Sequence, residues 1–191
     1  MAGKGESNPL RRGDALIVVD VQNDFCPGGA LPIPRGDEVV PVLNGWIARA
    51  AEAGIPVIAS RDWHPKDHVS FKRQGGQWPV HCVQGSEGAA FRPDLKLPGD
   101  AFIVTKGDRT DRDQYSAFDA TGLAEELRRR GVKRTWIGGL AEDVCVRATA
   151  LDAAKADFDT QVIAAATKPV TAEGGEVARA DMRKAGVTIV D

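Results

Sequence analysis

The stretch ALIVVD, residues 15–20, has five consecutive apolar residues and ends in an aspartate. A continuous apolar run of this length is typical of a strand that is covered on both faces, as in a parallel sheet between two layers of helices. Further short runs of this kind lie at residues 55–61, 101–106, 134–140, 161–164 and 187–190. Between them, Leu, Val and Ala recur at helical spacing over residues 38–53, 121–130, 142–155 and 173–184. Strand and helix patterns therefore alternate along most of the chain.

This alternation predicts a three-layer, doubly wound α/β fold with a mostly parallel sheet of about six strands. Parallel strands need crossover connections, and right-handed crossovers cover both faces of the sheet. The 191 residues are about one domain's worth of chain, and no internal repeat or linker is visible. We therefore predict a single domain over residues 14–191. Residues 1–13 are rich in Gly, Ser, Asn and Arg, which predicts a flexible N-terminal arm.

The composition of the chain argues against nucleic-acid-binding, membrane and secreted proteins. The chain is 42% hydrophobic and 27% charged, with a net charge of -2, which is ordinary for a globular protein and offers no basic surface for nucleic acid. No apolar run approaches the roughly 18 residues of a membrane span, and the N-terminal residues lack the apolar core of a signal peptide. The three cysteines cannot all pair, which favours reduced thiols. We expect a cytoplasmic protein with a small-molecule partner, no nucleic acid and no membrane; a homo-oligomer stays open.

Reactive side chains follow four consecutive predicted strands. Asp20 ends the first strand, Asp62 and His64 follow the second, and Lys106 ends the third. The fourth runs through GGLAEDVC to Cys145, at the start of a helix. Ligands of open parallel sheets bind beyond the carboxyl ends of the strands. We therefore expect these side chains to meet at one edge of the sheet.

Each of these residues, taken alone, could have a purely structural role. Cys145 could be a small buried apolar residue, Asp20 a loop acceptor and Lys106 a solvated charge. Together they suit acyl transfer, because a helix N-terminus favours a thiolate and a nearby carboxylate could take the thiol proton. Residues 138–141 precede the helix and could offer backbone N–H groups to an oxyanion. A Cys/His pair requires one of the distant histidines to fold back.

The three histidines of the chain, His64, His68 and His81, lie within 18 residues of each other. Asp62 and His64 are two residues apart, so in an extended segment both point to one face and can share a cation, with His68 or His81 completing the site. Two imidazoles and one carboxylate suit Zn, Fe or Mn. The alternative is a set of hydrogen-bonded loop histidines. Cys82 is either a soft ligand or, more commonly, a buried cysteine.

Five motifs, in order and spacing, resemble the isochorismatase-like hydrolases and, within that family, the nicotinamidases. The resemblance runs from about residue 15 to the C-terminus and rests on ALIVVDVQNDFCPGGAL, SRDWHPKDHVSF, GQWPVHCVQGSEGAAF, VTKGDRTDRDQYSAF and GGLAEDVCVRATALDA. It implies the isochorismatase-like hydrolase fold and an amidohydrolase. The expected reaction is hydrolysis of nicotinamide, and also of pyrazinamide, to the acid and ammonia through a Cys thioester, as in NAD salvage.

The resemblance also implies roles for individual residues. The catalytic triad falls on Asp20, Lys106 and Cys145. The ligands of one divalent metal ion fall on Asp62, His64 and His81, and His68 matches a position that ligates metal in only some members. Zn is the first expectation for this ion, with Fe or Mn as alternatives.

The implied oxyanion donors are the backbone amides of Ala141 and Cys145, which the family reaches through a cis peptide before Ala141. Aromatic residues that flank the substrate ring correspond to Phe25 and Trp78, with Tyr115 nearby. Two positions depart from many relatives, which have Thr in place of Glu142 and an aromatic residue or His in place of Val144. These departures affect the details of substrate recognition rather than the nucleophile.

Three alternative functions stay open. A sister amidohydrolase that acts on a ureido or N-carbamoyl compound would use the same triad. An isochorismatase-type vinyl ether hydrolase would need neither the cysteine nor the metal ligands. A metal-binding or redox module would bind metal and react through its thiol without turning over any amide.

Overall fold

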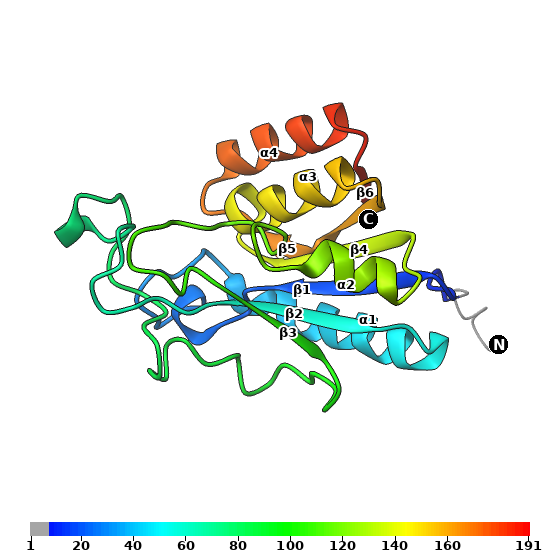
Figure 1. Cartoon of the computed structure of the whole chain (residues 1–191), viewed down its shortest axis with the longest axis horizontal. Helices are drawn as coiled ribbons and strands as arrows, with labels where there is room; N and C mark the ends of the chain where they lie inside the picture. Colours follow the sequence, from blue (N-terminus) through cyan, green and yellow to red (C-terminus); the bar gives the residue numbers. More distant parts are fainter. Residues whose placement is uncertain (1–7) are drawn as a thin grey trace.

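The computed structural model describes residues 8–191 and contains one six-stranded sheet, in which every adjacent pair of strands is parallel. The order across the sheet is β3-β2-β1-β4-β5-β6 (Figure 1). The strands are β1 Asp14–Val19, β2 Val57–Asp62, β3 Phe102–Lys106, β4 Arg134–Leu140, β5 Asp159–Lys168 and β6 Thr188–Val190. The helices are α1 Val39–Ala53, α2 Leu123–Arg129, α3 Arg147–Lys155 and α4 Ala172–Lys184. The predicted fold class is confirmed.

The helices form two layers, one on each face of the sheet (Figure 1). Alternate residues of β1 point to opposite faces, so Leu16 and Val18 pack in the cluster that contains the apolar side of α1. Ile17 and Val19 belong to the second cluster, with apolar residues of α2, α3 and α4. All six residues of β1 are buried, which explains why its sequence is continuously apolar rather than alternating.

Two predicted elements differ in detail from the structure. β5 spans Asp159–Lys168, longer than the predicted 161–164, because β4 pairs with it on both sides of a register shift that contains the alanines. The helix predicted over residues 142–155 divides into a π turn, Glu142–Val146, and α3. The nucleophile candidate therefore lies on an irregular turn, a feature that is frequent at functional sites.

The N-terminal prediction is covered only in part. Residues 1–7 of the expected arm lie outside the described residues. From Asn8 onward the chain packs against the domain: the Asn8 side chain donates to the carbonyl of Arg49 at 2.9 Å, and Leu10 is buried. Between residues 8 and 191, no helix is long and apolar enough to cross a membrane.

Candidate active site

The Lys106 ammonium lies at the centre of the predicted catalytic group. Its Nζ is 2.8 Å from Asp20 Oδ2, 2.5 Å from Asp62 Oδ1 and 3.5 Å from Cys145 Sγ. Lys106 and Asp20 are completely buried, and Cys145 is nearly so. The four residues come from the carboxyl ends of β1, β2 and β3 and from the turn after β4. The structure thus brings the predicted triad together at the expected edge of the sheet.

Asp20 is held by a local backbone feature and by one hydroxyl. It follows β1 with a φ of 48°, in the left-handed region that Asp tolerates better than most residues. Ser60 Oγ donates to its Oδ1 at 2.7 Å. The other oxygen, Oδ2, has no partner with hydrogen-bond alignment among the described residues, although the Lys106 ammonium lies close to it. Oδ2 is therefore free to accept a proton from the cysteine.

Burial and charge set the protonation of this group. Burial raises the pKa of Asp20, and neither Lys106 nor the Ser60 hydroxyl fully offsets it. Burial alone would raise the pKa of Asp62 as well, but Lys106 and His64 outweigh it and lower that pKa. Burial opposes the charge of Lys106, yet its two carboxylates raise the pKa well above the usual value. Lys106 is therefore a permanent cation between an ionised Asp62 and a more basic Asp20.

The thiol of Cys145 differs from the prediction that a helix dipole favours its thiolate. Burial raises the pKa of Cys145 well above its ordinary value, Lys106 lowers it only in part, and the charges of Asp20 and Asp62 raise it further. The resting group is a thiol, so attack requires proton transfer as the carbon–sulfur bond forms. A neighbouring carboxylate with a raised pKa, as Asp20 has, suits that transfer.

The π turn arranges the backbone around the thiol. The carbonyl of Ala141 accepts hydrogen bonds from the amides of Val144 at 3.1 Å and Val146 at 3.0 Å. The peptide between Leu140 and Ala141 is cis, as the family resemblance implies. Gly139, with a φ of 131°, passes so close to Val19 that any side chain there would collide with the backbone of β1. This close approach fixes the end of β4 directly beside the strand that carries Asp20.

Asp62, His64 and His81 form a buried group that could hold a metal ion. One ligand atom from each lies within 4.8 Å of the others. His64 Nδ1 and His81 Nδ1 are 2.9 Å and 2.7 Å from the carbonyls of Gly107 and Pro79. In the neutral form of each ring, Nδ1 therefore carries the proton and Nε2 has a lone pair for a cation, the arrangement usual for zinc histidines. The donor set suits the divalent ion that the sequence predicts.

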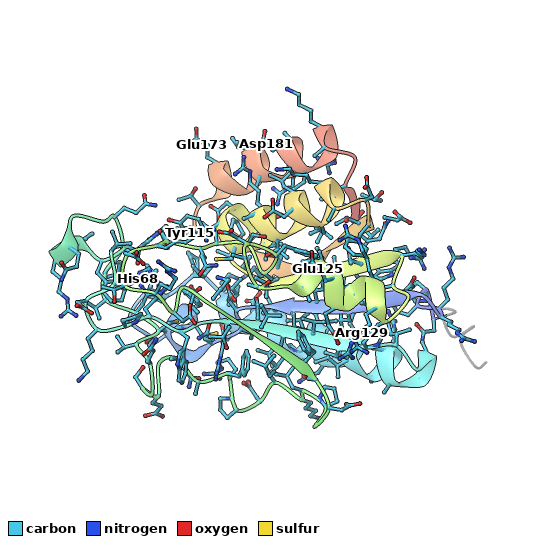
Figure 2. The ribbon with its side chains drawn as sticks, in the orientation of Figure 1. His68, Tyr115, Glu125, Arg129, Glu173 and Asp181 are labelled. Atoms are coloured by element: carbon cyan, nitrogen blue, oxygen red, sulfur yellow. The ribbon has the colours of Figure 1, made fainter. Side chains whose placement is uncertain are left out.

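His68 lies beside this group but does not belong to it. Its Nδ1 is 2.7 Å from Ser70 Oγ and its Nε2 is 2.9 Å from the carbonyl of Arg112, so both ring nitrogens have partners. Its ring stacks on that of His64, with 4.2 Å between centroids. In Figure 2, His68 lies among the loops at the same end of the molecule as Tyr115. His68 thus supports the position of His64, and the option that it ligates metal is not supported.

A mostly apolar pocket of about 440 Å³, counted to its open mouth, lies between the cysteine and the metal-ligand group. The three predicted aromatic residues line it: Phe25, Trp78 and Tyr115. Trp78 Nε1 donates to the Tyr115 hydroxyl at 3.1 Å, and this bond fixes the two rings relative to each other. Cys145 and Ala141 also reach the pocket. A flat ligand between these rings would present one end to the thiol and the other to the metal-ligand group.

The sequence did not predict the roles of several residues that surround the catalytic and metal-ligand groups. Gln22 is buried and pairs with the backbone of Asp62 in both directions, at 2.8 Å each. Ser60 holds Asp20, as described above. Glu142, one of the two departures, is 2% exposed and accepts two hydrogen bonds of 2.8 Å from Arg179 of α4. These residues could be found only as polar positions inside otherwise apolar segments. Val144, the other departure, lines the pocket.

Comparisons with known proteins agree with this geometry. The nicotinamidase of Escherichia coli (strain K12) is 39% identical over 92% of this chain and 93% of its own. The crystal structure of the pyrazinamidase of Pyrococcus horikoshii in complex with zinc has a TM-score of 0.91 and 47% identity, covering 94% of this chain and 99% of its own. A protein of L. infantum, crystallised in complex with nicotinate, has a TM-score of 0.88 and 35% identity, covering 94% of this chain and 93% of its own. The Isochorismatase domain matches residues 14–191, and the chain therefore belongs to the isochorismatase family.

Proposed function

We propose that this protein is an amidohydrolase that converts nicotinamide, and also pyrazinamide, to the corresponding acid and ammonia. The observation that carries the proposal is the position of the Lys106 ammonium, which contacts Asp20, Asp62 and Cys145 at once beneath an aromatic pocket. The E. coli and P. horikoshii relatives, named for nicotinamide and pyrazinamide hydrolysis, support the same reaction.

The first half-reaction forms a thioester on Cys145. Asp20 Oδ2 accepts the thiol proton while Sγ attacks the carboxamide carbon, and Lys106 stabilises the charge on both groups. The backbone N–H groups of Ala141 and Cys145 donate to the oxyanion. Asp20 then returns the proton to the amide nitrogen, the carbon–nitrogen bond breaks and ammonia leaves.

The second half-reaction restores the enzyme. Water gives a proton to Asp20 while its oxygen attacks the thioester carbonyl. The carbon–sulfur bond breaks, Asp20 passes the proton to Sγ, and nicotinic acid leaves and ionises to nicotinate. One carboxylate thus acts in both halves, which is consistent with a pKa raised by burial.

Asp62, His64 and His81 would hold one divalent ion, for which the zinc complex of the P. horikoshii relative favours Zn over Fe or Mn. When bound, this ion supplies a Lewis acid that can hold the ring nitrogen and orient the ligand. Phe25, Trp78 and Tyr115 would contact the ring, with stacking worth about 0.5–1.5 kcal/mol per aromatic pair. We further propose that the protein is cytoplasmic and can form a homo-oligomer.

A panel of amides tests the function. Ammonia release should give a much higher kcat/KM for nicotinamide and pyrazinamide than for benzamide, because benzamide has nearly the same shape but lacks the ring nitrogen. Trp78→Ala should lower kcat/KM for nicotinamide more than it lowers the alkylation rate of Cys145. A ureidoacrylate or an N-carbamoyl amino acid that is hydrolysed much faster than nicotinamide would contradict the proposal and favour the sister amidohydrolases.

A further inference from the structure

Asp113 is a charged residue of the pocket wall that the reaction described above does not use. It lies in the long segment between β3 and α2, two residues before Tyr115, and it lines the pocket half-buried. Tyr115, labelled in Figure 2, marks this stretch of the wall. Burial raises the pKa of Tyr115, and the negative charge of Asp113 contributes to that shift. The carboxylate therefore acts on the space that a ligand would occupy.

No Lys or Arg side chain between residues 8 and 191 forms an ion pair with this carboxylate. Arg109 and Arg112, the nearest basic residues along the chain, pair with Asp111 at 3.0 Å and with Asp119 at 2.5 Å. Asp113 makes no ion pair in the part of the chain that the structure describes. Besides its interaction with Tyr115, its Oδ1 accepts a hydrogen bond from the amide of Gln114 at 3.1 Å.

The rest of the described pocket wall also lacks a cationic side chain. None of the described residues that line it is Lys or Arg. Lys106 lies beneath it, completely buried, and its ammonium is shared between two carboxylates. The formal charges of Asp20, Asp62, Asp113 and Lys106 sum to minus two. A divalent ion at the metal-ligand group would bring the site to zero, whereas the same site without Asp113 would carry one excess positive charge.

We propose that Asp113 is a specificity-determining residue, which disfavours ligands that carry a carboxylate and so selects neutral carboxamides over acidic amides and over the acid product. This inference rests on the proposed function, because it concerns the ligands of that same pocket. The product of the reaction is an anion, whereas its substrate is neutral. A negative charge in the wall thus weakens product binding without a matching effect on the substrate.

The test compares two ligands of nearly equal shape, nicotinamide and nicotinate. Zinc-loaded protein with the Cys145→Ala substitution binds each without turnover, and calorimetry gives the ratio of their Kd values. Asp113→Asn should shift this ratio toward nicotinate by about fivefold to thirtyfold, which is the range that Coulomb's law gives for two unit charges when their separation is set to about 8 Å and the effective dielectric constant to about 20–40. Asp113→Asn keeps the oxygen that caps the Gln114 amide, and Asp113→Ser offers a second replacement with an acceptor.

The matched control is Asp111→Asn, which changes the net charge equally at a fully solvated position two residues away. Its Kd ratio should stay within twofold of the parent ratio. A ratio that is unchanged in both Asp113 variants, or shifted as much by Asp111→Asn, would overturn the inference. If the parent protein, which retains Cys145, fails to release ammonia from nicotinamide, the proposed function is contradicted instead. The ratio of Kd values would still report on Asp113.

Discussion

Removal of the Ser60 hydroxyl should change the pH dependence of the enzyme in a predictable direction. Ser60 Oγ and Asp20 Oδ1 are 2.7 Å apart and both side chains are completely buried. This hydrogen bond favours the ionised carboxylate and lowers the pKa of Asp20. A hydrogen bond to a charged group is worth about 1.5–3 kcal/mol, and one pKa unit corresponds to about 1.4 kcal/mol. In Ser60→Ala, the pKa of Asp20 should therefore rise.

The assay is the pH profile of kcat/KM for nicotinamide. Because Asp20 must be ionised to accept the thiol proton, activity is lost as the pH falls through its pKa. The acid limb of the profile should therefore lie at higher pH in Ser60→Ala, so that kcat/KM at a fixed pH on that limb falls by about tenfold to hundredfold, and alkylation of Cys145 should show the same displacement. Ser60→Thr keeps the hydroxyl and should keep the acid limb of the parent. Coincident acid limbs in the parent and Ser60→Ala would refute Asp20 as the base.

Three further predictions test other parts of the site. Cys145→Ala should abolish ammonia release while retaining nicotinamide binding; more than a small percentage of the parent rate would contradict a thioester. His81→Ala should lose both the metal ion, measured by elemental analysis, and ammonia release, whereas His68→Gln should retain the ion. An equal loss of metal in the two variants would identify His68 as a ligand. Arg179→Ala leaves the buried Glu142 carboxylate unpaired, which should cost about 3–5 kcal/mol and lower the Tm by about 6–20 °C. Arg147 pairs with Asp181 at 2.6 Å on the exposed surface, and such a pair should contribute at most about 1 kcal/mol, so an equal Tm loss in Arg147→Ala would contradict this account.

Much of the fold could be predicted because the apolar pattern and the burial coincide. The run that forms β1 is buried at every position, and the spacing of Leu43, Trp46, Ile47 and Ala50 matches the buried side of α1. The extension of β5 through Ala165 and Ala166 could not be predicted, since alanine has little preference for strands and the strand regains its pairing with β4 only at Thr167, after a register shift. The π turn at Glu142–Val146 likewise depends on packing that spacing does not encode.

The positions of the site residues could be predicted where they follow from the order of the parallel strands along the chain. Parallel topology brings Asp20, Lys106 and Cys145 together, and the motif resemblance selects His81 over His68 as a ligand. The pKa of the thiol could not be predicted, because burial outweighs the helix-terminus effect. The partners of individual ring nitrogens were equally inaccessible, since a backbone carbonyl such as that of Arg112 has no signature in the sequence.

The ammonium shared by two carboxylates also constrains how this enzyme can be redesigned. A designer who replaces Asp62 with a neutral ligand, in order to favour a softer metal, would also remove one of the two counter-charges of Lys106. The lysine would then interact more strongly with Asp20, lower its pKa and make it a weaker base toward a thiol that burial keeps protonated. Metal selectivity and nucleophile activation thus cannot be optimised separately, and a library that varies Asp62 alone will recover few active members unless the neighbours of Asp20 vary with it.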